Sequence, residues 1–330
     1  MSFSLRSECG IIPVQITSSL KLHKPRSRLD TQVLPFIALL GSLFGTTLIA
    51  SRFGVSQFDP TTYIGLRLSL ASLLFFLVYL LPFNKRKWPT DRKLWLHASI
   101  LGIFGTAIPM TGMVTALQYL SSGLTSILVT VNPAFTVLMA HFFLTDERLN
   151  RRKVLGVFLA LGGTVLLALR GETGLSDAGE PNLLGYALVL IAMLFASGMT
   201  IYARKYMAAF DSVDVTSVRM FIAALIVMPL SILVVGFDLG DVTGQGLFAL
   251  LYATGAGTFL GMLLAFYNIK RFGATAAAMT AYVIPVVASL GGWFILKEEI
   301  TTGMLVGMAF VVAGIAFINL RREKVTHLRG

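Results

Sequence analysis

The chain repeats part of its own sequence at a constant offset of 152 residues. A fixed long-range register of this kind indicates duplication of one structural unit. The matched positions are Arg52 and Arg204, Asp59 and Asp211, Arg67 and Arg219, Gly105-Thr106 and Gly257-Thr258, Pro133 and Pro285, and the acidic pairs Asp146-Glu147 and Glu298-Glu299. Whatever one copy folds into, the other copy is expected to fold into as well.

Composition places both copies in a membrane. Hydrophobic residues make up 55% of the 330, and charged residues make up 13%, whereas a soluble domain is about 25% charged. Many apolar runs approach the roughly 20 residues that cross a bilayer as a helix, and none shows the alternation of an outer-membrane barrel. The sequence predicts an all-α polytopic protein with ten transmembrane helices. They are expected at 33–51, 61–82, 94–113, 122–144, 154–169, 182–203, 215–236, 246–268, 274–296 and 301–319.

Basic residues fix the expected orientation, because Lys and Arg accumulate on the cytoplasmic side. With ten spans and a cytoplasmic N-terminus, the opposite side carries only Arg52, Arg170 and Lys297 of the 27 basic residues, and two more lie within spans. The net charge of +11 is therefore a topology signal and gives no support for nucleic acid binding. We expect a multi-pass protein of the cell (inner) membrane with both termini cytoplasmic.

The same count predicts how the copies are related. We expect cytoplasmic tails at 1–31 and 321–330, and repeats of five transmembrane helices at 32–170 and 182–320. Five is odd, so the second repeat is expected to be inverted relative to the first, which is the plan of many secondary transporters.

Arg67 and Arg219 are the two basic residues within predicted spans. A charge at the centre of a transmembrane helix costs about 2.5–3.5 kcal/mol on insertion scales. Each arginine lies about 8–9 Å from a span end at about 1.5 Å per residue, so it either anchors or packs the helix, or acts as a gate or binding residue for a carboxylate or phosphate. Inversion puts the two near opposite faces, which predicts paired gate-side roles in place of one shared site.

Two prolines interrupt predicted spans, Pro133 in the fourth and Pro285 in the ninth. Proline removes a backbone hydrogen bond and kinks a helix. Asn132 adds a polar side chain beside Pro133. The sequence leaves two interpretations open: packing kinks, or breaks that open space for a substrate between the repeats.

Small, hydroxyl-bearing and adaptable side chains supply further candidates. Spans one and six are rich in small residues, and Gly41 and Gly45 have a spacing that lets helices approach closely. Close packing and the lining of a cavity are both compatible with this pattern. The candidate substrate-binding or gating residues are Thr46, Arg67, Met110, Asn132, Pro133, Ser197, Arg219, Thr258, Tyr267, Tyr282 and Pro285.

The sequence also excludes some functions. All 16 acidic residues fall in predicted tails, loops or span ends, which argues against an exporter that binds cations at a membrane-embedded carboxylate. No metal-spaced His and Cys set, phosphate-binding glycine loop or nucleophile motif is present. We expect no enzyme activity, no metal and no cofactor.

Several motifs resemble one transporter family. They are NIKRFGATAAAMTAYVIPV (268–286), KEE (297–299), Gly303 and Gly307 in the second copy, and NPAF (132–135), TDERL (145–149) and Gly156 in the first. The chain resembles the EamA-type, ten-span members of the drug/metabolite transporter superfamily over about residues 33–320. The resemblance implies inverted five-helix repeats, alternating access and a small organic metabolite as cargo.

From these observations we expect a secondary transporter, an exporter of an amino acid or similar zwitterion, working through a cavity between the repeats. The alternative is a membrane sensor or assembly partner that moves no substrate. The partners expected are a small-molecule substrate and the lipid bilayer, with a homodimer left open.

Overall fold

In a computed structural model of the whole chain, the structure describes residues 33–81, 86–144, 149–176, 183–240, 242–272 and 279–319. The expected tails, the pair Asp146-Glu147 and residues 273–278 lie outside the described residues. Within the described ranges, every regular element is a helix. Nine helical stretches there are at least 18 residues long and apolar enough to cross a bilayer, and Thr280–Leu296 is a shorter apolar helix. The predicted all-α polytopic fold is confirmed.

The ten predicted spans match these helices in order. The first half comprises α1 (Leu34–Gly54), α2 (Pro60–Leu80), α3 (Arg92–Gly102) continued by η1 (Ile103–Ala107) and α4 (Ile108–Ala116), α5 (Ser122–Val129) followed by α6 (Asn132–Phe143), and α7 (Arg151–Leu169). The second half comprises α8 (Leu183–Tyr206), α9 (Ser212–Val234), α10 (Gly244–Tyr252) continued by η2 (Ala253–Leu260) and α11 (Gly261–Phe272), α13 (Thr280–Leu296) and α14 (Thr302–Asn319).

The second helix of each repeat begins in the same way. Asp59 caps α2 by accepting a hydrogen bond from the backbone N–H of Thr61, and Asp211 caps α9 by accepting one from Val213. An aspartate at this position satisfies backbone donors that have no partner inside the helix. The matched aspartates of the 152-residue register are therefore matched helix starts.

Spans three and eight contain π-helical stretches and span four is broken, whereas the described part of span nine, α13, is one continuous helix. The stretches η1 and η2 are π-helices, which the sequence did not predict, and they occupy equivalent positions in spans three and eight. Span four breaks between Val129 and Asn132, directly before Pro133, as the proline predicts. In span nine, α13 continues through Pro285.

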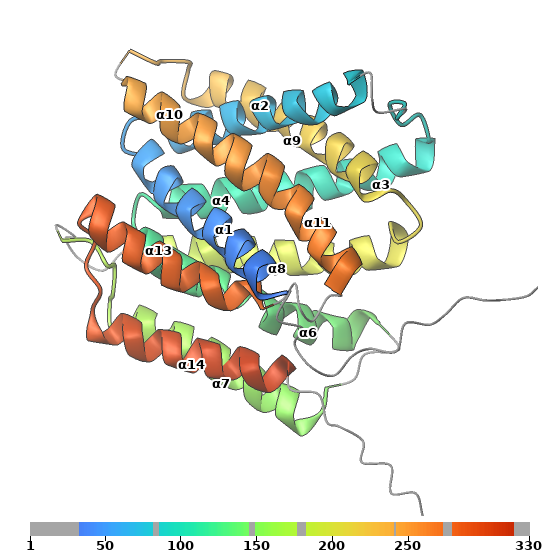
Figure 1. Cartoon of the computed structure of the whole chain (residues 1–330). Helices are drawn as coiled ribbons and strands as arrows, with labels where there is room; N and C mark the ends of the chain where they lie inside the picture. The colour runs from blue at the N-terminus through green and yellow to red at the C-terminus, as the bar shows by residue number, and fades with distance from the viewer. Residues whose placement is uncertain are drawn as a thin grey trace, which may run out of the picture.

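Equivalent helices of the two repeats run antiparallel against each other. Along α2 and α9, Thr62 contacts Ser231, Gly65 lies against Met228 and Tyr79 contacts Asp214, so residue numbers rise on one helix as they fall on the other. The pair α7 and α14 follows the same rule, with Gly156 against Gly314 and Gly163 against Gly307, and lies side by side in Figure 1. Antiparallel packing of equivalent helices requires the second repeat to be upside down relative to the first, which confirms the inversion.

The two repeats also interleave. Helix α1 packs along α13, seen as blue beside red in Figure 1, with Gly41 against Val283 and Gly45 against Val287. A Cβ atom at Gly41 would lie 2.4 Å from the Cβ atom of Val283. The close-packing interpretation of this glycine pair is therefore confirmed. In the other direction, α8 packs along α6.

The orientation predicted from the basic residues is testable by cysteine labelling. In a Cys9→Ser background, which removes the one native cysteine, we expect a membrane-impermeant maleimide to label Ser56→Cys on intact cells. Lys87→Cys, also on an exposed residue, should react only after the cells are permeabilised, because the basic loops face the cytoplasm. Labelling of Lys87→Cys and not Ser56→Cys on intact cells would reverse the predicted orientation.

Candidate functional site at the crossing of the two repeats

Arg67, on α2 of the first repeat, is bound by the second repeat. Its side chain is 4% exposed, and its Nε donates a hydrogen bond of 2.9 Å to the hydroxyl of Thr258 in η2. Its Nη1 donates a bond of 3.1 Å to Ser51 at the end of α1. Two of the sequence candidates, Arg67 and Thr258, are thus brought together, and the guanidinium is held inside the bundle, so it does not extend to the lipid headgroups.

Arg219, on α9 of the second repeat, makes the reciprocal contact. Its Nε donates a hydrogen bond of 2.8 Å to the hydroxyl of Thr106 in η1, and its Nη2 donates one of 3.2 Å to the carbonyl of Gly105. Under the 152-residue offset Arg67 becomes Arg219 and Thr106 becomes Thr258. The two contacts are therefore one interaction, made twice and exchanged between the repeats. We call α2, α9, η1 and η2 the central crossing.

Both threonines lie on π-helical turns, where the backbone hydrogen bonds span five residues instead of four. The Thr106 hydroxyl lies 3.4 Å from the carbonyl oxygen of Leu101, and that of Thr258 lies 3.3 Å from Ala253, each five residues back. Each hydroxyl donates to that carbonyl and accepts from an arginine. The wide turn is thus fixed by a side chain from the other repeat, and π-helical turns occur frequently at functional sites.

Two glycines allow the π-helical turns to fit closely against the first helix of the opposite repeat. A Cβ atom at Gly257 would lie 2.1 Å from Thr47 Oγ1 on α1, and one at Gly105 would lie 2.9 Å from the Cβ atom of Met199 on α8. Each Gly-Thr pair therefore divides its roles. The glycine permits the close approach of a helix, and the threonine binds the arginine.

The charges of the two arginines have no acidic partner nearby. Within the part of the chain that the structure describes, no carboxylate lies within ion-pair distance of either guanidinium. Hydroxyl and carbonyl oxygens take that place, three of them from the other repeat and one, that of Ser51, from the repeat of Arg67 itself. A buried charge without partners is expensive in hydrocarbon, so the three contacts that cross between the repeats are strong constraints on how the repeats sit together.

The two arginines do not form one binding site. The antiparallel register of Thr62 with Ser231 and Gly65 with Met228 places Arg67 opposite Ile226. Ile226 and Arg219 are seven residues apart on α9, which is roughly 10 Å along the helix axis at about 1.5 Å per residue. One arginine therefore lies on each side of the centre of the α2–α9 pair.

Two further polar pairs join the repeats. The Ser197 hydroxyl on α8 donates to the backbone carbonyl of Asn132 at 3.1 Å and also contacts the Asn132 side chain. The Thr46 hydroxyl on α1 lies 2.8 Å from the hydroxyl of Tyr252 on α10. Asn132 and Ser197, both sequence candidates, are therefore in direct contact beside Pro133 at the break in span four.

The remaining candidates are dispersed. Met110 is partly buried against the apolar cluster around α2 and α9, and Tyr282 accepts a hydrogen bond of 3.4 Å from Asn319. Tyr267 is 43% exposed and contacts the rings of Phe36 and Phe272. Pro285 is buried within α13. Three cavities lined by described residues lie around α13, and none of the eleven candidates lines them.

Glu298 is a buried acid whose role the sequence did not indicate. Its side chain is 5% exposed, and it accepts hydrogen bonds from the backbone N–H of Ser122 at 2.8 Å and from the Ser122 hydroxyl at 2.7 Å. A third, of 3.4 Å, comes from the Gly123 N–H. It therefore caps the start of α5 in the other repeat, where a negative charge is favourable. The 152-residue register and the KEE motif had singled out this residue, but neither indicated that it caps a helix of the other repeat.

The two ends of the α2–α9 pair differ chemically although they are equivalent in position. At one end the hydroxyls of Thr62 and Ser231 lie 2.7 Å apart. At the other end the equivalent residues are Asp214 and Tyr79, and the tyrosine hydroxyl donates to the carboxylate, also at 2.7 Å. One end is thus joined by two neutral groups and the other by a charged hydrogen bond.

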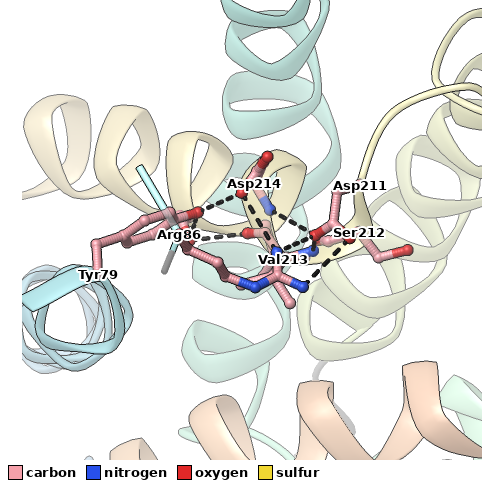
Figure 2. Close-up of polar contacts among 8 residues, drawn as sticks. Tyr79, Arg86, Asp211, Ser212, Val213 and Asp214 are labelled. Atoms are coloured by element: carbon pink, nitrogen blue, oxygen red, sulfur yellow. Dashed lines mark hydrogen bonds and ion pairs between the residues drawn. The ribbon is translucent and has the colours of Figure 1, made fainter. Parts of the chain in front are cut away.

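Figure 2 shows that Arg86 extends the charged end into a cluster. Its Nη1 lies 2.7 Å from an Asp211 carboxylate oxygen and 3.6 Å from Asp214. The Arg86 guanidinium beside Asp211 holds the pKa of that carboxyl below its usual value. The offset that relates the repeats places Asp238 where the first repeat has Arg86, so the ionic contact is confined to one face.

Comparison with known proteins identifies the repeated unit. The family model described as the EamA-like transporter family matches the chain twice, at residues 33–169 and 183–320. An uncharacterized transporter of Archaeoglobus fulgidus is 27% identical over 87% of this chain and 98% of its own length. The uncharacterized transporter YoaV of Bacillus subtilis is 26% identical over 84% and 92%. The uncharacterized inner membrane transporter YedA of Escherichia coli K12 is 25% identical over 88% and 92%.

A solved crystal structure is similar to this fold. Its TM-score is 0.61 with 18% sequence identity, and the match covers 88% of this chain and 98% of that one. At this identity the likeness concerns the fold alone.

The close fit of η2 against α1 predicts different costs for two neighbouring glycines. Gly257→Ala should lower the free energy of unfolding by about 1–3 kcal/mol, because the added methyl group meets Thr47 in a tightly packed interior. Gly255→Ala, in the same π-helical turn with no atom within 4 Å of the added carbon, is the matched control and should leave stability unchanged or slightly raised. Thermal unfolding in detergent measures both, and equal melting temperatures would contradict the packing.

The Arg86 cluster predicts a small contribution that depends on pH. Because the pKa of Asp211 is lower in the folded protein, the contact stabilises the fold above the ordinary pKa of the carboxyl and is lost as the pH falls through the lowered one. Both side chains are about a third exposed, so Arg86→Gln should cost less than about 1 kcal/mol at neutral pH.

The matched control for this variant is Lys87→Gln, which removes a neighbouring exposed cation. Melting temperatures between neutral and strongly acidic pH measure the effect. The difference between Arg86→Gln and the native protein should disappear once Asp211 is protonated. A difference of constant size across the whole pH range would contradict the ionic contact.

Proposed function

The chain belongs to the EamA-like transporter family and is a membrane transporter, and we propose that it exports a small organic metabolite by alternating access between its two repeats. The observation that carries this proposal is the reciprocal pair of arginine contacts in the central crossing. It joins two inverted repeats, taken as residues 32–170 and 182–320, through one interaction made twice. Both termini are proposed to be cytoplasmic.

Inverted repeats support a transport cycle because they give one protein two states that are related by a two-fold axis in the membrane plane. Exchanging the conformations of the two repeats moves the opening from one face to the other around a site near the bilayer midplane. In a state that is open to one membrane face, the contacts at the two faces must differ. A contact that both repeats make at the same time is the same at both faces and favours neither state. The central crossing holds both Arg67–Thr258 and Arg219–Thr106 together. We therefore assign it the role of a fixed axis, and we place the gates outside it.

The contacts that differ between the faces are the candidates for gates. The Arg86, Asp211 and Asp214 cluster closes one end of the α2–α9 pair, and Thr62 with Ser231 joins the other. A charged hydrogen bond is roughly twice as strong as a neutral one. This asymmetry favours a resting state in which the ionic end is closed, and it gives the cycle a preferred starting point.

The cargo proposed is a hydrophobic amino acid or similar zwitterion. The partly buried side chains beside the central crossing combine a thioether, Met110, with hydroxyls of Thr46 and Tyr252. Thioether and aromatic groups adapt to apolar side chains, whereas a few hydroxyls orient a polar head group. The sequence places all 16 acidic residues in predicted tails, loops or span ends, which supports a cargo without a net positive charge.

A flux measurement tests the proposal and the central crossing together. In vesicles reconstituted with the protein, we expect flux of at least one hydrophobic amino acid in a panel. Arg67→Gln and Arg219→Gln should each reduce the rate about tenfold or more while most of the protein remains folded. A tenfold change corresponds to about 1.4 kcal/mol, comparable to one hydrogen bond of a charged group.

Thr258→Ser and Thr258→Val form the matched control pair, because serine keeps the hydroxyl that Arg67 binds and valine removes it. Flux should survive in the serine variant and fall in the valine variant. If Arg67→Gln and Arg219→Gln lost folded protein and flux to the same extent, both arginines would have only a packing role. No flux of any metabolite through well-folded protein would refute transport.

A further inference from the structure

A cavity of about 420 Å³ lies at the face where α1 and α13 end. Arg52, Lys297 and Glu298 line it, together with an apolar wall formed by Phe53, Leu175 and Leu296. Its volume falls within the range of about 300–1,000 Å³ typical of small-molecule sites. The lining thus combines charged groups with apolar side chains.

The charge available in this cavity is positive. Glu298 is already occupied by three donors from Ser122 and Gly123 at the start of α5, and the Nε atom of Arg52 is 4.0 Å from it. Within the described ranges, the Arg52 guanidinium makes no hydrogen bond, and the Lys297 ammonium has neither a hydrogen bond nor an ion pair. Two cationic groups therefore line the cavity and have N–H donors that bind no acceptor among the described residues.

Basic residues are unusual on this face. The orientation predicted from the loops leaves only Arg52, Arg170 and Lys297 there, because Lys and Arg are otherwise concentrated on the cytoplasmic side. Two of these three line one cavity. The concentration of basic residues on the cytoplasmic side does not explain Arg52 or Lys297. A local role for these two residues is the simpler explanation.

The backbone of Lys297 supplies an independent observation. Its φ angle is +59°, in the left-handed region, and it is the one described residue other than glycine with a positive φ. Helices that end in this conformation usually have glycine at this position, because glycine adopts it without strain. The cavity is thus lined by a lysine where the backbone favours glycine. Strained residues of this kind cluster at ligand sites.

We infer that this cavity is an anion-binding vestibule, in which Arg52 and Lys297 bind the carboxylate of an amphipathic cargo while its apolar part packs on Phe53 and Leu296. The inference rests on the proposed transport function and specifies where the cargo meets this face. A phosphate group of a lipid carries the same oxyanion chemistry, so the test must separate a dissolved carboxylate from a lipid headgroup.

Trp293 provides a reporter, because it lines the neighbouring cavity of about 550 Å³ that shares Lys297 and Glu298 with the vestibule. Replacing Trp88 and Trp95 by Phe leaves it as the sole tryptophan of the chain's three. This protein, in nanodiscs of zwitterionic phosphatidylcholine, is titrated with leucine, leucinamide, acetate and inorganic phosphate. Leucinamide matches leucine but lacks the carboxylate.

We expect saturable changes in Trp293 fluorescence with leucine and weaker changes with acetate or phosphate, and none with leucinamide. Affinity for leucine should fall at least about tenfold in Arg52→Gln and in Lys297→Gly. The melting temperature of Lys297→Gly should stay level or rise, because glycine relieves the left-handed backbone. Arg170→Gln, the same charge change on the same face outside the cavity, should bind leucine as the native protein does.

Equal responses to leucine and leucinamide, or no response to any of the four probes, would overturn the vestibule. So would a response that appears only in nanodiscs containing anionic phosphatidylglycerol, which would assign the cations to lipid. Flux that persists unchanged in Arg52→Gln and Lys297→Gly would refute the vestibule and leave transport standing. Carboxylate binding that depends on both residues, without flux, would refute transport and leave the vestibule standing.

Discussion

The structure depends on placing two arginine charges inside a mostly apolar bundle. Neither Arg67 nor Arg219 has a carboxylate within ion-pair distance among the described residues, so each needs hydrogen-bond acceptors that hydrocarbon cannot provide. The acceptors are the threonine hydroxyls of the opposite repeat. Because the Nε atom of each arginine is bound by the opposite repeat, the requirement joins the two halves at the Gly-Thr pairs of the widened helical turns.

Because the repeats are duplicated and inverted, one type of contact binds both arginines. Departures from this symmetry give the two faces different properties. The equivalent pairs Thr62–Ser231 and Asp214–Tyr79 occupy corresponding places, yet only one is charged. Arg86 strengthens that end, and the second repeat has Asp238 in the corresponding position. In the transport cycle that we propose, the scaffold supplies two equivalent states, and these few side chains favour one of them at rest.

Much of the fold followed from the sequence because it rests on length, hydropathy and charge, which are local properties. The helix positions and the inversion could be predicted in this way. The partners of Arg67 could not, because a side chain's contacts depend on which helices cross, and η1 and η2 have no sequence signature. One signal was present: the 152-residue offset pairs Arg67 with Arg219 and the Gly-Thr pair of η1 with that of η2. The same offset pairs Glu298 with Asp146, but its role depends on the distant start of α5, which the offset does not reveal.

We propose that the repeats rock about a fixed crossing of α2 and α9. Distances between spin labels test it on three exposed pairs: Leu169 with Phe248 at one face, Leu155 with Ala208 at the other, and Leu73 with Leu225 beside the crossing. On addition of a transported cargo, the two face distances should change in opposite directions while the distance at the crossing stays constant. Face distances that change in the same direction, or a crossing that widens with them, would contradict the account.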